Sequence, residues 1–498
     1  MKLKFLAMLG LSAGLMLQSC SDDDAPIDYS EPDVEAENPK DNAFSDKVDL
    51  TGYKAQKAFN LADVTLSNAT YDVAKTYQKV VGIGAMLTPK GWAPSPSVGQ
   101  IDELYNEYGL NILRLYIYGD KSQWSSDIDV IKQAVKDGAV IIACPWEAPA
   151  SLTETTNQIV WSDGTKSELQ KDVKHLKHTN WTKYAKHLID YVAYMKQQGV
   201  SIYAMSVQNE PDAEFMYWDP KEIRMFVEQY GEEIVAKTGV KLMAPEACGM
   251  REDYTNEVLN SSKAYAATNI IAGHLYQGFS NINGTAHNNG YVKNRYNYIN
   301  GLWAKISGDK KQWWMTEHLF NDGENETDTS KWQFLNWDYC LNHLALEMHD
   351  CMAASCSAYV YWYIKRFYGL IYDNDAKGRS GGNKENTYSH NAFIMAQWAG
   401  FASGKTRMEA KCDDKDIKLT AYKNSKGNEL SFVAINFGSK TKYLSIPVDT
   451  DEFVAYGITS DKGSQAKQQL TKIRPNCFTE RVVLAIPAMG IGSVTVLK

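Results

Sequence analysis

Eight short apolar runs, spaced through residues 80–363, constrain the fold of this chain more than any other feature of its sequence. The runs lie at residues 80–86, 112–117, 139–144, 202–207, 242–244, 270–275, 313–315 and 358–363. Most are separated by stretches with the apolar spacing of amphipathic helices, for example residues 184–198 and 220–237. Eight buried strands alternating with helices predict a (β/α)8 barrel rather than a doubly wound sheet.

The regions on either side of the expected barrel have the character of β-structure. After residue 407 apolar and polar residues alternate, and residues 46–80 contain short extended segments. A chain of 498 residues also exceeds the roughly 250–300 residues that one hydrophobic core usually serves. We therefore expect N-terminal strands at 46–80, a barrel at 81–406 and a C-terminal β domain at 407–498, with the two β regions forming one side domain.

The start of the chain resembles an export signal. Lys2 and Lys4 precede an apolar stretch at residues 5–17 that is too short to span a bilayer. We expect residues 1–20 to be a signal peptide that takes no part in the fold.

A lipid anchor is expected directly after this signal. Cys20, which follows the small Ser19, resembles the lipidated cysteine of a bacterial lipoprotein, and residues 21–24 resemble the acidic surface-export tag of Bacteroidota lipoproteins. Residues 21–45 are acidic and almost free of large apolar side chains, which predicts a flexible tether. The expected location is the outer membrane or cell surface of a Bacteroidota-like bacterium.

Charge and motif content argue against several other classes of function. The 52 basic and 60 acidic residues are interspersed and leave a net charge of −8, so nucleic-acid binding is not expected. The cysteines beyond Cys20 form no CxxC pair, and neither an HExxH nor an EF-hand pattern occurs, so no metal site is expected. Gly82-Ile-Gly84 lacks the third glycine of a dinucleotide site, and we expect no cofactor.

Two glutamates end apolar runs and are the candidate catalytic pair. Glu210 stands in an Asn-Glu-Pro motif, and Glu317 follows it by 317 − 210 = 107 residues, which is three βα units of roughly 35 residues each. This spacing places them at the fourth and seventh strands, on opposite sides of the barrel mouth. Glycoside hydrolysis requires two such carboxyl groups flanking one glycosidic bond. We assign Glu210 as acid/base and Glu317 as nucleophile, with Glu147 and Glu246 as rivals.

The expected mechanism retains the configuration of the sugar. Retaining enzymes hold the two carboxyl groups about 5–5.5 Å apart, and inverting enzymes about 6.5–9.5 Å apart. We expect the shorter separation, with the pKa of Glu210 raised by burial and by the charge of an ionised Glu317. The alternative is that either glutamate is a structural ion-pair partner at the barrel mouth.

Other strand-end residues are candidates for supporting roles. Arg114 is flanked by apolar residues and needs a carboxylate partner, for which Glu317 is the natural candidate. His274 and Tyr276 end the sixth run and are candidates to bind the nucleophile or the sugar, with a structural role as the alternative. Two tryptophans are candidate stacking platforms for sugar rings, with a core role as the alternative: Trp146 and Trp362.

Six stretches together resemble glycoside hydrolase family 30, and in particular its bacterial glucuronoxylanase branch, the glucuronoarabinoxylan endo-1,4-β-xylanases. They are residues 138–146, 206–212, 244–246, 273–276, 314–318 and 358–370, within a likeness that extends from about residue 60 to the C-terminus. The resemblance implies a (β/α)8 TIM barrel fused to a side β-sandwich built from both chain ends. It also implies an enzyme that cleaves β-1,4-xylan internally, with retention, at positions set by a glucuronic or methylglucuronic acid branch. Separately, we expect the protein to be a monomer.

The resemblance carries over to three further residues. In many barrel glycosidases the asparagine before the acid/base binds the 2-hydroxyl of the sugar, and Asn209 stands at that position. Glucuronoxylanases grip the uronate with an arginine and a tyrosine after the eighth strand, and Arg366 and Tyr368 stand there. The planar fork of arginine suits a carboxylate, which is a physical reason for this assignment.

Departures from the family pattern leave alternatives open. Residues 82–85 read Gly-Ile-Gly-Ala where relatives usually have Gly-Phe-Gly-Gly, and Glu147 replaces a frequent asparagine. Residues 322–328 are acidic, and residues 373–389 are longer and more polar than usual. The alternatives are another family 30 activity, such as a branch-independent xylanase, a β-glucosidase or a β-1,6-glucanase, or a non-catalytic glycan-binding surface lipoprotein.

Overall fold

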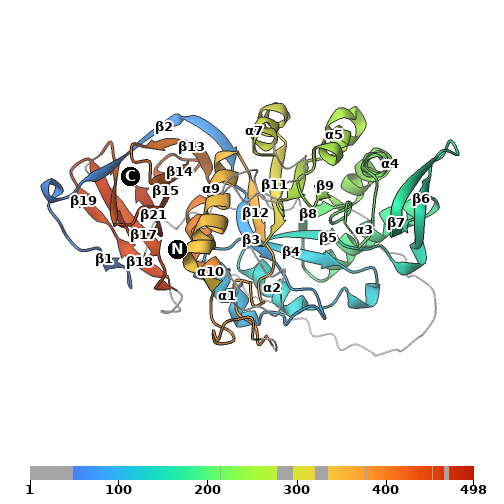
Figure 1. The fold of residues 1–498 in the computed structure, drawn as a ribbon, viewed down its shortest axis with the longest axis horizontal. Coiled ribbons are helices and arrows are strands. Elements are labelled where there is room, and N and C mark those ends of the chain that lie inside the picture. The colour runs from blue at the N-terminus through green and yellow to red at the C-terminus, as the bar shows by residue number, and fades with distance from the viewer. Residues whose placement is uncertain are drawn as a thin grey trace, which may run out of the picture.

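The computed structural model describes residues 49–213, 215–276, 295–319, 335–375, 378–450, 452–464 and 470–498, with only the backbone for 295–297 (Figure 1). The predicted signal peptide, Cys20, the tether and the acidic residues 322–328 lie outside these ranges. Within them, none of the helices is long and apolar enough to cross a bilayer. The seven cysteines within these ranges have free thiols.

Eight parallel strands close into a barrel, in which each strand pairs with the next along the chain and the last pairs with the first. Most of their residues are buried because helices cover the outside and side chains fill the interior. All eight correspond to the apolar runs, which confirms the predicted barrel. The strands are β3 (Gly82–Met86), β4 (Ile112–Ile117), β5 (Val140–Pro145), β8 (Ile202–Ser206), β9 (Lys241–Ala247), β10 (Ile270–His274), β11 (Gln312–His318) and β12 (Ala358–Tyr361).

Helices surround the barrel and follow local capping rules. α4 shows them most fully. The Asp219 side chain accepts a hydrogen bond from the Lys221 amide, the Glu222 carboxylate accepts one from the Asp219 amide, and Gly239 ends the helix at φ 73°. The helices are α1 (Val98–Asn106), α2 (Ile128–Lys136), α3 (Trp181–Gln197), α4 (Pro220–Thr238), α5 (Glu252–Asn260), α6 (Ser262–Ala267), α7 (Arg295–Ile306), α8 (Trp337–Cys340), a π-helical turn at Leu341–Ala345, α9 (Leu346–Ala353) and α10 (His390–Ala402). Short 3-10 turns lie at Leu61–Asp63, Lys121–Gln123, Ala150–Leu152, His178–Asn180 and Ser307–Asp309.

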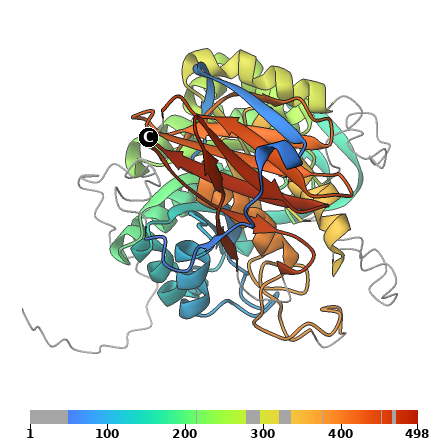
Figure 2. The ribbon, with the colours of Figure 1, turned by 90° about the vertical axis from the view of Figure 1, so that its left-hand side faces the viewer.

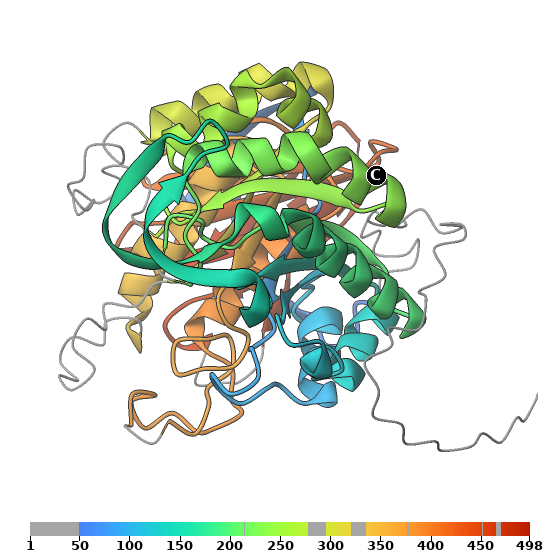
Figure 3. The ribbon, with the colours of Figure 1, turned by 90° about the vertical axis from the view of Figure 1, so that its right-hand side faces the viewer.

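A two-stranded hairpin, β6 (Thr153–Val160) and β7 (Lys166–Leu176), follows β5 and was not expected from the sequence. It arches away from the barrel beside α3 and α4 (Figure 3). Its strands are rich in Thr, Lys and Glu and mostly exposed, so they lack the apolar alternation that marks a half-buried strand.

An eleven-stranded side sheet contains strands from both ends of the described chain (Figure 2). The long β2 pairs antiparallel with β13 and parallel with β16, so residues before the barrel lie among strands that follow it. The two-ended side domain is therefore confirmed. Its strands are β1 (Lys54–Ala55), β2 (Leu66–Lys79), β13 (Thr406–Cys412), β14 (Ile417–Lys423), β15 (Glu429–Asn436), β16 (Lys442–Pro447), β17 (Val454–Ser460), β18 (Thr471–Arg474), β19 (Asn476–Phe478), β20 (Arg481–Ile486) and β21 (Gly490–Leu497).

Helix α10 joins the two units. It packs against β3 of the barrel on one side and against β15, β17 and β21 of the side sheet on the other, and nearly all of its residues are buried. A helix covered on both sides is apolar all round, which explains the sequence of this segment. One of its buried amides, Gln397, donates to Ser460 Oγ at 2.7 Å and accepts from Ser493 Oγ at 2.7 Å, so the helix is hydrogen-bonded to the side sheet.

Candidate active site

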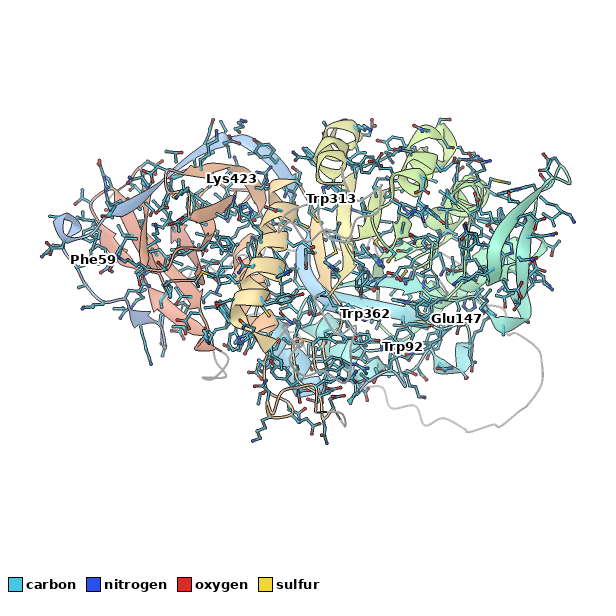
Figure 4. The ribbon with its side chains drawn as sticks, in the orientation of Figure 1. Phe59, Trp92, Glu147, Trp313, Trp362 and Lys423 are labelled. Carbon is cyan, nitrogen blue, oxygen red and sulfur yellow. The ribbon has the colours of Figure 1, made fainter. Side chains whose placement is uncertain are left out.

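The C-terminal ends of the barrel strands bring the candidate residues to one end of the barrel. Arg114 lies on β4, Glu246 on β9, His274 on β10 and Glu317 on β11, and Glu210 follows β8 by four residues. All five are buried. Three neighbouring aromatic or acidic residues of the same mouth, Trp92, Glu147 and Trp362, are labelled in Figure 4.

Glu210 and Glu317 face one another across a short gap. One carboxylate oxygen from each, together with one ring nitrogen of His274, lie within 4.8 Å of one another. An oxygen-to-oxygen distance below this bound is compatible with the about 5–5.5 Å separation of retaining enzymes and shorter than the about 6.5–9.5 Å of inverting ones. The structure therefore agrees with the separation expected from the sequence.

Glu317 is held by two donors, one on each oxygen. Arg114 Nη1 donates to Oε2 at 2.5 Å, and Tyr276 Oη donates to Oε1 at 2.7 Å. Arg114 Nη2 also donates to Asn209 Oδ1 at 2.7 Å, so one guanidinium positions both Glu317 and Asn209. Burial raises the pKa of Glu317, and the charges of His274 and Arg114 oppose that effect.

Glu210 has a strained backbone and a charged neighbour. Its φ is 42°, a left-handed value that is uncommon for a residue with a side chain, and its amide donates to the carbonyl oxygen of Glu246 at 3.0 Å. His274 Nδ1 lies 2.9 Å from Glu210 Oε1. The hydrogen bond therefore aims the carboxyl group at the gap that it shares with Glu317.

Glu246 completes the group behind His274. Its Oε2 lies 3.1 Å from His274 Nε2, and it accepts hydrogen bonds from the hydroxyls of Ser206 and Thr316. Although burial opposes ionisation, His274, Arg114 and Ser206 lower the pKa of Glu246 to about 2. Glu246 is therefore an ionised carboxylate behind the catalytic pair and faces His274 rather than the gap.

His274 carries a proton in the free protein. Burial alone would lower its pKa, but the charge of Glu317 and the hydrogen bonds to Glu210 and Glu246 raise the pKa of His274 to about 10. In consequence the pKa of Glu210 is lowered despite its burial. The expectation of a raised pKa at Glu210 is wrong for the free protein, because sequence reasoning paired this residue with Glu317 and overlooked the imidazolium.

Comparison with characterised proteins identifies the family of this chain. It is 30% identical over 380 residues to the glucuronoxylanase XynC of Bacillus subtilis strain 168, which covers 74% of this chain and 78% of that protein. A GH30 endoxylanase structure from Clostridium papyrosolvens C71 matches 87% of this chain and 100% of its own, with 25% identity and a TM-score of 0.67. The chain belongs to glycoside hydrolase family 30. The resemblance seen in the sequence is thus confirmed.

More distant matches to this family 30 chain bear on its fold alone. The family 30 subfamily 8 xylanase Xyn30A of Clostridium acetobutylicum is 24% identical, with a TM-score of 0.65 over 86% of this chain and 100% of its own. No protein-family model matches the chain.

In this family 30 chain, the two predicted uronate-binding residues lie next to each other beyond β12. The guanidinium carbon of Arg366 lies 6.0 Å from the ring centre of Tyr368, and Arg366 Nη1 donates to the carbonyl oxygen of Trp92 at 2.5 Å. Burial raises the pKa of Tyr368 to about 12, against the opposing charge of Arg366, so its hydroxyl stays a hydrogen-bond donor at neutral pH. Asp373 is close enough to Arg366 for that charge to oppose the rise that burial causes in the pKa of Asp373.

The predicted stacking platforms are buried. Trp146 is only 1% exposed and lies between the ring of Tyr116, at 4.7 Å, and the Arg114 guanidinium, at 4.7 Å. Trp362 is 6% exposed and packs on Trp146 with ring centres 5.5 Å apart. The burial of Trp146 against Arg114 favours the core role that was the alternative to a stacking platform.

An exposed aromatic pair was missed. Trp92 and Phe215 are 37% and 41% exposed and stack with ring centres 5.6 Å apart. The ring of Trp92 lies 5.9 Å from that of Trp362, so the pair adjoins the active site. Trp92 stands in a Pro- and Gly-rich loop after β3, the first barrel strand. Loops lie at the surface, so a large aromatic residue in this loop could have been recognised from the sequence as an exposed binding candidate.

Glu147, a rival for the catalytic roles, faces away from them. It forms an ion pair with Lys174 of the β6–β7 hairpin, and its side chain is 43% exposed. A carboxylate in this setting has no place in the buried pair.

Proposed function

We propose that this chain is a retaining endo-β-1,4-xylanase that cleaves glucuronoxylan at positions set by a glucuronic or methylglucuronic acid branch. The main observation behind this proposal is that Glu210 and Glu317 are buried at the mouth of a family 30 barrel, with one oxygen of each within 4.8 Å of the other. The substrate class follows from the relatives, a glucuronoxylanase and an endoxylanase.

The geometry suits a double displacement. A Glu317 oxygen attacks the anomeric carbon while Glu210 gives a proton to the departing glycosidic oxygen, which leaves a covalent glycosyl-enzyme. Glu210 then takes a proton from water, and the hydroxyl oxygen displaces Glu317 with restoration of the original configuration. In the free protein the proton needed for the first step resides on His274, and its 2.9 Å contact provides a direct route to Glu210.

Substrate choice depends on Arg366 and Tyr368. A uronate carboxylate placed between them would accept hydrogen bonds from the guanidinium fork and from the phenol. Asp373 favours the second candidate, a branch-independent family 30 xylanase, because a carboxylate acting on Arg366 competes with a bound uronate.

Product profiling on glucuronoxylan tests the proposed specificity. Mass spectrometry is expected to show xylo-oligosaccharides that each carry one uronate at a fixed position from the reducing end. A ladder without a fixed branch position would instead establish the branch-independent activity. Glu317→Gln is expected to release no product from glucuronoxylan, and an active variant would contradict the assignment of Glu317 as the nucleophile.

We also propose that a lipid on Cys20 anchors the protein to the outer membrane or cell surface. The anchored protein is proposed to be a monomer. Support comes from the charged and apolar start of the chain and from Ser19-Cys20. Cell fractionation of Cys20→Ala is expected to move the protein out of the membrane fraction, whereas the protein with Cys20 stays there. Unchanged membrane association of the variant would contradict the anchor, and light scattering of the soluble form measures the oligomeric state.

A further inference from the structure

A second group of histidine and glutamate side chains lies outside the catalytic centre. His175 is the penultimate residue of β7, His178 begins the following 3-10 turn, and Glu222 is in the first turn of α4. His175 Nε2 lies 2.7 Å from Glu222 Oε1, and His178 Nε2 contacts the same oxygen. One ligand atom from each of the three lies within 4.8 Å of the others.

The buried charge of Glu222 needs a cation. Its side chain is fully buried, and its second oxygen accepts a hydrogen bond from the Asp219 amide at 2.8 Å. Across the described residues its ion pairs are with the two imidazoles, and none is formed with a lysine or arginine. An isolated buried carboxylate is costly, so either an imidazolium or a bound metal ion must balance it.

The surroundings of the group are those of a metal site. Glu154 Oε1 lies 3.5 Å from His175 Nδ1, which has no hydrogen bond among the described residues, so a small shift would let this carboxylate orient the ring as an outer carboxylate orients many metal-binding histidines. The His178 side chain is 25% exposed, so solvent can reach a fourth coordination position. Two imidazoles, a carboxylate and water form a ligand set that zinc accepts.

We propose that His175 Nε2, His178 Nε2 and Glu222 Oε1 bind one divalent metal ion of the zinc class, with water as fourth ligand. Zinc bonds of about 2.0–2.2 Å in a tetrahedron separate ligand atoms by about 3.3–3.5 Å. His175 Nε2 must therefore move away from Glu222 Oε1 by about 0.6–0.8 Å, and His178 Nε2, which is closer to that oxygen, must move further. His178 can supply this movement because it is the least buried ligand. The two histidines are three positions apart and the carboxylate follows 44 residues later, a spacing that differs from the HExxH, CxxC and EF-hand motifs searched for in the sequence.

The metal would join two walls of the active-site mouth. His175 lies near the end of the hairpin inserted after β5, His178 directly follows the hairpin, and Glu222 lies in the helix that comes after Glu210. The hairpin also contacts the mouth through the ion pair of Lys174 with Glu147. The bound ion acts as a structural clamp between these elements and takes no part in the chemistry, so the inference does not depend on the proposed substrate.

Metal titration of the purified protein tests the site. After dialysis against EDTA, calorimetry with ZnCl2 is expected to show one equivalent bound, with a rise in Tm, and CoCl2 should give the visible absorption bands of a tetrahedral site. His178→Gln keeps a hydrogen-bond donor toward Glu222 but removes the imidazole, so we expect the zinc affinity to fall at least about tenfold.

Two further variants locate the ion. His349→Gln, at a histidine paired with Asp350, should bind zinc as the unaltered protein does. Glu317→Gln should also retain binding, which separates this site from the group formed by Glu210, His274 and Glu317. Absence of zinc binding, or binding that His178→Gln leaves unchanged, would show that the triad is a hydrogen-bonded clamp alone and would overturn the proposal.

Discussion

At the scale of single residues, His274 holds a proton among three carboxylates, those of Glu210, Glu246 and Glu317. Its two ring nitrogens contact Glu210 and Glu246, while Arg114 and Tyr276 engage Glu317. Glu317, the proposed nucleophile, and Glu210, the proposed acid/base, are both buried glutamates near strand ends. Their different neighbours are therefore what gives them different roles.

Glu246→Gln is expected to move the alkaline limb of the pH profile of kcat/KM to lower pH, by about one unit. The substitution removes the negative charge that helps His274 keep its proton, so the proton shared with Glu210 is lost more readily. Glu147→Gln, which alters an exposed carboxylate paired with Lys174, serves as the control and should leave the profile in place. An unshifted alkaline limb in Glu246→Gln would show that Glu246 has only a packing role.

Arg366→Ala is expected to reduce kcat/KM on glucuronoxylan by about tenfold to a hundredfold, since a charge-assisted hydrogen bond contributes roughly 1.5–3 kcal/mol. Activity on arabinoxylan that carries no uronate branch should change little, because Arg366 does not contact the catalytic pair. Parallel assays on the two polymers measure this ratio. Equal losses on both substrates would reject the uronate-binding role.

At the scale of elements, the barrel depends on close approach of β3 and β4. An added Cβ at Gly84 would lie 2.0 Å from the carbonyl oxygen of Ile112, and backbone cannot move aside cheaply. Gly84→Ala is therefore expected to destabilise the protein by about 3 kcal/mol, measured by urea denaturation.

Gly99, exposed in α1, is the matched control. An added Cβ there meets only Ser97 Oγ, at 4.0 Å. Gly99→Ala should stabilise the helix by about 0.5–1 kcal/mol, because alanine restricts the unfolded chain. Similar stability of the two variants would contradict the steric account of β3.

The elements also differ in how well their sequence predicts them. Barrel strands are recognisable because they are continuous apolar runs, and β2 and β14 because they contain extended segments. The β6–β7 hairpin was missed because its exposed strands have no buried face. Its position is determined by contacts such as Lys174 with Glu147, which no local pattern encodes.

At the scale of the whole molecule, the active-site charges couple stability to pH. The pKa of His274 rises from 6.5 to about 10 in the folded state, so its contribution is complete below pH 6.5 and is lost as pH rises through 10. The pKa of Glu246 falls from 4.5 to about 2, so its contribution is complete above pH 4.5 and is lost as pH falls through 2.

The Tm is therefore expected to be highest between about pH 4.5 and 6.5 and to decline toward pH 10. Calorimetry across this range measures the decline, and His274→Gln should show a shallower one because it lacks the titrating group. An equal alkaline decline in the variant would assign the effect to other groups.

The sequence by itself determined the barrel and the two-ended side sheet, and it predicted Glu210 and Glu317 as the catalytic pair. These follow from hydrophobic periodicity and from the 107-residue spacing, which are local or nearly local properties. Family resemblance added Asn209, Arg366 and Tyr368, whose roles stay predictions. Sequence was a weaker guide to which strand-end groups are catalytic and which are supporting.

Only the tertiary structure decided the charge states and the exposure of side chains. The low pKa of Glu210 and the burial of Trp146 depend on partners from other strands, and the convergence of His175, His178 and Glu222 depends on a hairpin meeting a helix. Electrostatic interactions act through space and strengthen with burial, so their sign and size are set by neighbours that are distant along the chain.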